Sequence, residues 1–364
     1  MKKILFFIII IVFVPKVCYG VDISAKSACL IAADTCEIVY EKHSDIRLPM
    51  ASTTKMMTAL VAAESDKWDE VATVSLNAQN QIGSKIYLKA NDRMMLSDLV
   101  KGMLLNSGND AAVAVAEHVS GDVECFAEDM NNCADRIGAD NTNFQNPSGL
   151  DGDSHYSTAY DLAIIGAEVI RNEKLMPIIK SKELKITNLN GEVTYLRNHN
   201  KLLWSYDGML GVKTGFTKKA GRCLVTAAMR EGVTLVAVTL SAPNDWDDHK
   251  KLLDYGFEVC KSSTVIKKDD KFAEIEVDDK TVNLVSEEDV TLTDIRGKRE
   301  NREISIKKIA DIKGPINAGE KLGVAEIIQN GNIVASVDLV ADTDVREEKQ
   351  GIFLKIKRWI YNLI

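Results

Sequence analysis

Three short motifs carry the residue types of a serine nucleophile with a lysine base. They are Ser52-Thr53-Thr54-Lys55, Ser107-Gly108-Asn109 and Lys213-Thr214-Gly215. A serine hydroxyl is a poor nucleophile until a neighbouring base takes its proton. Ser52 and Lys55 stand three residues apart at an expected helix start, so their side chains share one face. We therefore predict that Ser52 is the nucleophile and Lys55 its base.

A lysine acts as a base near neutral pH only when its pKa is lowered. Burial or a nearby second cation lowers the pKa of a lysine, and Lys213 is the candidate second cation for Lys55. The unpaired N–H groups and the positive dipole end of a helix N-terminus also favour an oxyanion at Ser52. These features predict acyl transfer through an ester on Ser52.

The other two motifs supply groups for proton transfer and for substrate binding. Ser107 can pass a proton between Lys55 and a leaving amine. Asn109 can hydrogen-bond both a substrate carbonyl and Lys55. Because Gly215 has no side chain, an extended peptide can lie along the strand that carries it. The N–H of Phe216 is then the second donor to the oxyanion.

The specific signal is the order of the three motifs, because each motif alone occurs by chance in chains of this length. A serine-lysine motif, a serine/asparagine motif and K-T-G form the set that recognises penicillin. The chain resembles the low-molecular-weight penicillin-binding proteins, which are serine-type D-alanyl-D-alanine carboxypeptidases, over essentially its whole length. The stretches that carry the resemblance are 49–58, 104–112, 146–150, 155–161 and 208–216.

This resemblance implies a role for each motif residue. It implies that Ser52 is acylated, that Lys55 is the base and that Ser107 assists proton transfer. It also implies that Lys213 and Thr214 hold the terminal carboxylate of the substrate. The expected substrates are peptidoglycan stem peptides ending in D-Ala-D-Ala, and β-lactam antibiotics are the expected covalent inhibitors. No metal or organic cofactor is implied.

The sequence departs from the family pattern at one binding position. Some relatives carry an arginine after the strand that follows K-T-G, where it contacts the substrate carboxylate. Residues 244–249 of this chain contain no arginine. Either Lys213 and Thr214 suffice, or Arg222 helps them.

Three other classes of protein share the fold or the motifs and are alternatives to a carboxypeptidase. A class A β-lactamase needs a glutamate in an E-x-x-L-N loop, but before Leu189-Asn190 that position is Ile186. Fast penicillin hydrolysis is therefore not expected. A DD-endopeptidase would use the same site residues, although the β domain and tail favour the carboxypeptidase. A non-catalytic wall-binding or sensor protein would not need the nucleophile and its base.

The order of elements predicts a mixed α/β (α+β) fold, with an antiparallel sheet, flanking helices and a helical insert. The resemblance implies the penicillin-binding/serine β-lactamase-like fold for residues 21–262. Helices are expected where apolar residues recur at helical spacing, and strands where β-branched runs occur. The expected strands are 27–32, 37–40, 223–229 and 231–240, and the expected helices are 52–64, 97–105, 110–119 and one opened by Ser157 and Thr158.

After residue 262 the pattern changes to short alternating segments separated by Asp, Asn and Gly turns. We expect a small all-β domain over 263–346. Its expected strands are 272–277, 281–285, 290–294, 304–309, 322–328 and 333–340.

The first residues of the chain predict export, and the last predict an association with the membrane surface. Residues 1–20 combine a basic start, the apolar run 4–14 and small residues before Gly20, as in a signal peptide. An uncleaved anchor is the alternative, but the run is shorter than the about 20 residues that span a bilayer. Residues 347–364 predict an amphipathic helix on the membrane surface, or else one packed on the protein. The expected location is the outer face of the bacterial cytoplasmic membrane, or the cell wall.

The net charge bears on the partners of the chain, and the cysteines bear on metal binding and disulfides. Cleavage after Gly20 removes three lysines and no acid, which takes the net charge from −8 to −11. Such an acidic chain argues against nucleic acid as a partner. Six cysteines remain without metal spacing, and free thiols are favoured over essential disulfides. Because a lysine serves as base, His155, His199 and His249 are expected to be structural or surface residues.

Overall fold

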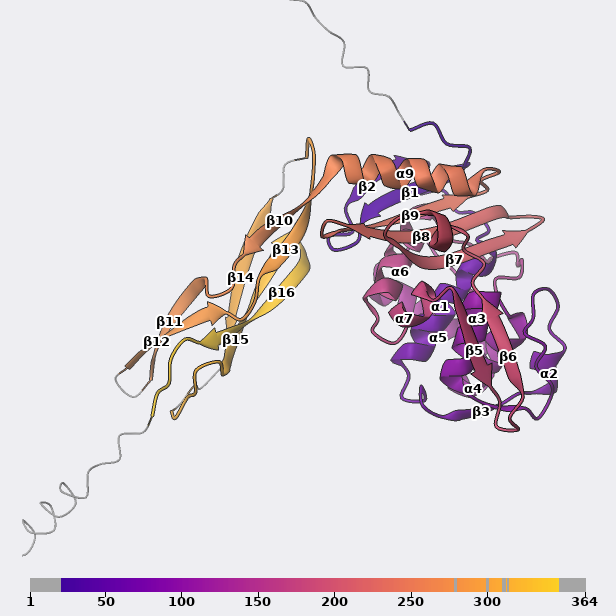
Figure 1. Ribbon diagram of the computed structural model, residues 1–364, viewed down its shortest axis with the longest axis horizontal. Helices are drawn as coiled ribbons and strands as arrows, with labels where there is room; N and C mark the ends of the chain where they lie inside the picture. The colour runs from indigo at the N-terminus through magenta and orange to yellow at the C-terminus, as the bar shows by residue number, and fades with distance from the viewer. Residues whose placement is uncertain (1–20, 278–279, 299–300, 310–311, 313, 347–364) are drawn as a thin grey trace, which may run out of the picture.

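The computed structural model describes residues 21–277, 280–298, 301–309, 312 and 314–346. The expected signal peptide and the expected C-terminal helix lie outside the described residues. Within the described ranges, no helix has the length and apolar character needed to cross a membrane. Figure 1 shows a part rich in helices, built around one sheet, and a separate elongated part made of strands.

The helix-rich part is organised by a five-stranded antiparallel sheet with the strand order β2-β1-β9-β8-β7. The expected strands of this sheet are confirmed, and the K-T-G motif lies on a strand, as expected, although the bounds of that strand were not predicted. The sheet strands are β1 (Ser27–Ala32), β2 (Ile38–Lys42), β7 (Met209–Thr217), β8 (Gly221–Arg230) and β9 (Val233–Leu240). The third motif thus lies on β7, an edge strand of this sheet.

A helix covers each face of the sheet. Helix α6 (Ala159–Arg171) packs on β8 and β9 at Gly166, where an added Cβ would lie 3.0 Å from a Val236 methyl. Helix α9 (Asp245–Val259) packs at Gly256, where an added Cβ would lie 2.5 Å from a Leu235 methyl. As expected, Thr158 opens α6, because its hydroxyl accepts from the N–H of Asp161 at 3.0 Å.

The helical insert between β2 and β7 supplies the first two motifs. Its helices over 97–105 and 110–119 are confirmed, as α3 and α4. Besides α6, the helical elements described between β2 and β7 are the short 3-10 turn η1 (Ala51–Thr54), α1 (Lys55–Glu64), α2 (Leu76–Gln79), α3 (Leu96–Asn106), α4 (Asn109–Ser120), α5 (Val123–Arg136), α7 (Met176–Lys180) and α8 (Leu202–Ser205).

The expected helix over 52–64 begins differently. Ser52 lies in η1, and the α-helical part begins only at Lys55. The Thr53 hydroxyl donates to the carbonyl of Met50 at 2.6 Å, and the Thr54 hydroxyl donates to the carbonyl of Ala51 at 2.9 Å. Such local side-chain bonds compete with α-helical backbone bonds, which accounts for the tighter first turn.

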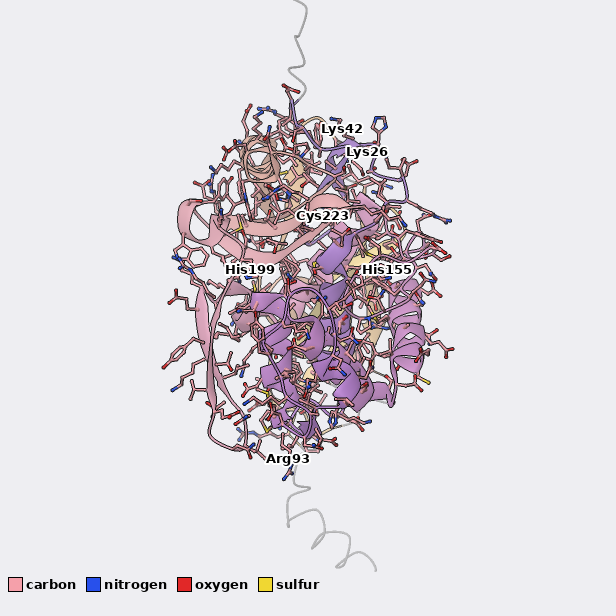
Figure 2. All side chains as sticks on the ribbon, turned by 90° about the vertical axis from the view of Figure 1, so that its right-hand side faces the viewer. Lys26, Lys42, Arg93, His155, His199 and Cys223 are labelled. Atoms are coloured by element: carbon pink, nitrogen blue, oxygen red, sulfur yellow. The ribbon has the colours of Figure 1, made fainter. Side chains whose placement is uncertain are left out.

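Two small two-stranded sheets were not predicted. Strand β3 (Val71–Thr73) pairs with β4 (Arg93–Met95), and β5 (Glu183–Thr187) forms a hairpin with β6 (Val193–Arg197). The tip of the β5–β6 hairpin meets the β3–β4 pair, since the N–H of Leu189 donates to the carbonyl of Arg93 at 2.8 Å. In Figure 2 the hairpin ribbon runs down one side of the molecule from near His199 to near Arg93.

The small all-β domain is confirmed, and each of its six expected strands is present. It consists of a five-stranded sheet, β11-β12-β16-β15-β14, beside the pair β10-β13. Strand β10 was not predicted and runs across the expected boundary at residue 262. The strands are β10 (Cys260–Ile266), β11 (Lys271–Val277), β12 (Lys280–Ser286), β13 (Val290–Ile295), β14 (Arg302–Lys308), β15 (Lys321–Gln329) and β16 (Asn332–Ala341).

Five of the cysteines are free thiols, as the sequence favoured. Cys29, Cys133 and Cys223 are buried, whereas Cys125 is exposed and Cys36 is partly exposed. Burial raises the pKa of the Cys223 thiol to about 11.

Candidate active site

Lys55 lies beneath Ser52, fully buried at the start of α1. Its Nζ is 3.0 Å from the hydroxyl oxygen of Ser52 and 2.7 Å from the Asn109 side-chain oxygen. It also donates to the backbone carbonyl of Ser148. The serine and the lysine of the first motif are therefore within hydrogen-bond reach, as their spacing predicted.

The surroundings of Lys55 favour the neutral amine. Burial lowers the pKa of Lys55 well below its ordinary value, and the positive charge of Lys213 acts in the same direction. The carboxylate of Asp110 opposes both effects on this pKa. The expected influence of Lys213 is present, but burial is the larger cause. A buried amine with a low pKa can accept the proton of the Ser52 hydroxyl.

The second motif lies in the joint between α3 and α4. Ser107 ends α3 in the left-handed region, with φ 60° and ψ 30°, and Asn109 begins α4. A non-glycine residue held in this region costs of order 1–3 kcal/mol, a type of strain that clusters at functional sites. The Asn109 amide nitrogen donates to the carbonyl of Ile82 at 2.6 Å, which leaves its second N–H for another acceptor.

The lysine of the third motif contacts the second motif in the protein interior. Lys213 is buried, and its Nζ donates to the Ser107 hydroxyl at 3.2 Å and to the carbonyl of Thr214 at 2.9 Å. Burial lowers the pKa of Lys213 to about 7. The Ser107 hydroxyl thus lies beside one lysine, while Asn109 contacts the other.

Gly215 also has a structural reason to be glycine, which the sequence did not reveal. A Cβ at this residue would lie 3.0 Å from the backbone nitrogen of Ser52 and 3.1 Å from that of Thr53. A side chain here would be crowded, because β7 passes directly against the turn that carries Ser52. The next residue, Phe216, has an exposed side chain at the rim of the cleft.

The cleft has a volume of about 330 Å³ and brings together residues of all three motifs. Arg222, opposite Phe216 on β8, also lines it. The Arg222 guanidinium pairs with Asp245 at 2.8 Å and lies 5.7 Å from the ring centre of Trp246. The motif residues in its lining are Ser52, Ser107, Thr214, Gly215 and Phe216.

Two supporting residues were missed by the sequence reasoning. Asp110 is buried behind Asn109, and its carboxylate accepts from the N–H groups of Ile86 and Leu88 at 3.1 Å each. It thereby fixes the segment that covers Asn109. Ser148 contributes only a backbone carbonyl to Lys55, so its residue type carries no signal. Asp110 directly follows the second motif, which was the one available hint.

Two of the three histidines are structural, as expected. His155 is buried, its Nε2 bonds to the Thr54 hydroxyl at 2.8 Å, and burial lowers its pKa to about 4. His249 lies between the hydroxyls of Thr226 and Thr239. His199 is an exposed residue, which also agrees with the expectation, and it lines the cleft. Figure 2 shows His155 and His199 on opposite sides of the helical part, below Cys223. In the described ranges, no cluster of side chains is suited to hold a metal ion.

Removing the charge of Lys213 should change the pH dependence of acylation. Because that charge lowers the pKa of Lys55, Lys213→Met raises the Lys55 pKa, and the acidic limb of the acylation profile moves to higher pH. Lys213→Arg keeps the charge and should leave the limb in place. The second-order rate of acylation by benzylpenicillin, followed against pH, measures this. A limb at the same pH in Lys213→Met would contradict the coupling of the two lysines.

A serine hydroxyl and a buried lysine amine thus lie within hydrogen-bond distance, between a sheet edge and a helical insert. Residues 14–244 match the family described as D-alanyl-D-alanine carboxypeptidase, and residues 261–347 match the penicillin-binding protein 5 C-terminal domain. The chain belongs to the D-alanyl-D-alanine carboxypeptidase family, a family of hydrolases.

Named relatives extend over most of the chain. It is 34% identical to D-alanyl-D-alanine carboxypeptidase DacF of Bacillus subtilis, over 91% of this chain and 88% of the relative. It is 31% identical to DacC of Escherichia coli, over 90% and 85%. The crystal structure of penicillin binding protein 5 from Haemophilus influenzae superposes with a TM-score of 0.65 at 31% identity, covering 90% of this chain and 98% of that one.

Proposed function

We propose that this protein is a serine D-Ala-D-Ala carboxypeptidase that removes the terminal D-alanine of peptidoglycan stem peptides through an ester on Ser52. The observation that carries the proposal is the buried Lys55 amine, 3.0 Å from the Ser52 hydroxyl and with a lowered pKa. Family membership supports peptidoglycan as the substrate and β-lactams as inhibitors.

Acylation begins when Lys55 takes the proton of the Ser52 hydroxyl. The Ser52 oxygen attacks the carbonyl carbon of the penultimate D-alanine, and the N–H groups of Ser52 and Phe216 stabilise the oxyanion. The C–N bond then breaks, and the leaving D-alanine amine receives a proton through Ser107. Water hydrolyses the ester and releases the shortened peptide.

The terminal carboxylate of the substrate is bound by Lys213 and Thr214 at the inner end of the cleft. A charged hydrogen bond to a carboxylate is stronger than a neutral one, and binding an anion also favours the protonated form of Lys213. Asn109 and the backbone of Gly215 position the peptide on the other side of Ser52. Arg222 offers a further cation at the rim, although its pairing with Asp245 already offsets its charge.

The test is the intact mass of the protein after incubation with benzylpenicillin, followed by an assay of free D-alanine from a pentapeptide ending in D-Ala-D-Ala. We expect a long-lived adduct of one penicillin, its loss in Ser52→Ala, and release of D-alanine by the unmodified protein. A short-lived adduct with rapid drug hydrolysis would instead favour a β-lactamase. The absence of any adduct would favour a non-catalytic wall-binding protein.

The proposal also covers where the protein acts, which is the outer face of the cytoplasmic membrane or the cell wall, and which part of the chain does what. Residues 1–20 direct export, 21–262 form the catalytic part, 263–346 the β domain, and 347–364 bind the membrane surface. The amphipathic pattern of residues 352–363, with Trp359 among its apolar positions, supports the last assignment. Retention on membrane vesicles that is lost when residues 347–364 are deleted would support it, and unchanged binding would exclude it.

A further inference from the structure

His155 is buried beside the turn that carries the nucleophile, and both of its ring nitrogens have partners. The backbone N–H of Gln145 donates to Nδ1 at 3.0 Å, and Nε2 lies 2.8 Å from the Thr54 hydroxyl. The Phe144 ring packs edge-on against the imidazole, with the ring centres 6.0 Å apart. These three contacts hold the imidazole in one position and one orientation.

The same contacts determine which ring nitrogen carries the hydrogen. A backbone N–H can only donate, so Nδ1 is the unprotonated nitrogen, and in a neutral ring Nε2 then carries the hydrogen. Burial lowers the pKa of His155 to about 4, while the charge of Asp151 raises this pKa and that of Lys55 lowers it. The ring is therefore neutral at neutral pH, and its Nε2–H donates to the Thr54 hydroxyl.

The Thr54 hydroxyl continues this chain of hydrogen bonds to the backbone. Since its oxygen accepts from His155, its own hydrogen is free, and it donates to the carbonyl of Ala51 at 2.9 Å. Three donors thus point in one direction along the chain: the Gln145 N–H, the His155 N–H and the Thr54 O–H. Hydrogen bonds in such a chain polarise and strengthen one another.

The carbonyl at the end of this chain shares a peptide unit with the N–H of Ser52. A peptide unit is planar, and in the trans form its C=O and N–H point in opposite directions. A hydrogen bond that holds the Ala51 carbonyl therefore also sets the direction of the Ser52 N–H, which is an oxyanion donor in the proposed mechanism. It also draws electron density towards the carbonyl oxygen, which makes this N–H a stronger donor.

The backbone at Ala51 depends on such support. Ala51 has φ 50°, in the left-handed region that is unfavourable for a residue with a side chain. Conformations of this kind persist only where the surrounding structure over-determines them. On the other side of Ala51, the Thr53 hydroxyl donates to the carbonyl of Met50 at 2.6 Å. The peptide units before and after Ala51 are thus each held by a threonine hydroxyl, and His155 holds the second of these hydroxyls.

We propose that His155 is a positioning residue for the oxyanion site, which it acts on through the Thr54 hydroxyl and the peptide unit between Ala51 and Ser52. The inference rests on the proposed function, because that function assigns the Ser52 N–H to the oxyanion. His155 is not among the described residues that line the cleft, so it acts through its neighbours. Its effect belongs to the acylation step, in which the oxyanion forms, and not to the binding of the intact substrate or drug.

The test separates the binding of benzylpenicillin from the acylation step, by stopped-flow measurement over a range of drug concentrations. His155→Leu removes the donor to Thr54, and Thr54→Val removes the hydroxyl at nearly the same side-chain shape. Loss of an oxyanion donor costs about 10²–10³-fold in rate, and loss of its support should cost less, roughly tenfold. We expect this fall in the acylation rate constant of each variant, with an unchanged dissociation constant for the drug.

Two conservative variants and one matched control complete the design. His155→Gln keeps an N–H donor and Thr54→Ser keeps the hydroxyl, so both should acylate at close to the normal rate. His249 is also buried between two threonine hydroxyls, but Thr226 and Thr239 lie on β8 and β9 of the sheet. His249→Leu should therefore lower the melting temperature and leave the acylation rate constant unchanged.

The outcomes separate this proposal from the proposed function. His155→Leu/Thr54→Val should acylate no more slowly than the slower single variant, because either change already breaks the chain. An unchanged acylation rate constant in Thr54→Val, or an equal fall in His249→Leu, would overturn the role of His155 alone. If His155→Leu does not fold, the comparison of Thr54→Val with Thr54→Ser decides, since the chain must pass through that hydroxyl. A lack of acylation in the unmodified protein would instead overturn the proposed function.

Discussion

Replacing Lys55 by methionine should lower the rate of acylation by roughly 10²–10⁴-fold, the contribution typical of a general base. The Lys55 amine contacts the Ser52 hydroxyl, and burial lowers the pKa of this amine. Methionine has a similar length and avoids the cost of burying an amine, so the fold should be retained. The measurement is the rate of adduct formation with benzylpenicillin, together with a thermal melt.

The control for this substitution is Lys67→Met. Lys67 also donates to backbone carbonyls, those of His118 and Val119, but it lies away from the cleft. We expect Lys67→Met to acylate at the normal rate. A Lys55→Met protein that melts normally and acylates as fast as this control would show that another group takes the Ser52 proton.

The second large effect is expected at Gly149, which has φ +84° and packs against the turn of the nucleophile. A Cβ there would lie 2.0 Å from the carbonyl oxygen of Ala51, one residue before Ser52. Gly149→Ala must therefore displace that turn. Since a misplacement of about 1 Å can cost 10²-fold in rate, we expect acylation to fall by about that factor or more.

The matched control is Gly191→Ala. Gly191 has nearly the same φ, +85°, but an added Cβ meets nothing within 4 Å. Both alanine variants carry the backbone cost of the left-handed region, about 1–2 kcal/mol, so their difference isolates the contact with Ala51. Equal acylation rates in the two variants would refute the account of Gly149. Adduct formation and thermal melts of both proteins provide the comparison.

The sequence predicted the parts of the site that depend on spacing along one element. The contact between Ser52 and Lys55 follows from their three-residue separation. The resemblance to the family predicted that the three motifs meet in one site. It did not predict Ser148 or Gly149, because the first acts through its backbone and the second through a close approach. Both effects depend on tertiary packing, which a local pattern does not report.

The fold shows the same division between local and tertiary information. The buried β-branched run of β9 and the alternating strands of the β domain were assigned correctly, since each forms from a strong local pattern. Helix α9 was missed, because its first turn is crowded with Asp245, Asp247 and Asp248, which resembles a polar loop. Those acids suit a helix N-terminus, where the positive dipole end favours negative charge.

The free thiols have a consequence for the redox conditions that the protein tolerates. Thiolate is the species that oxidises or exchanges, and burial keeps the pKa of Cys223 near 11, so little thiolate forms at neutral pH. Cys29 and Cys133 are buried as well, and burial also raises the pKa of each. Oxidation at these three buried positions should therefore be slow in the folded protein.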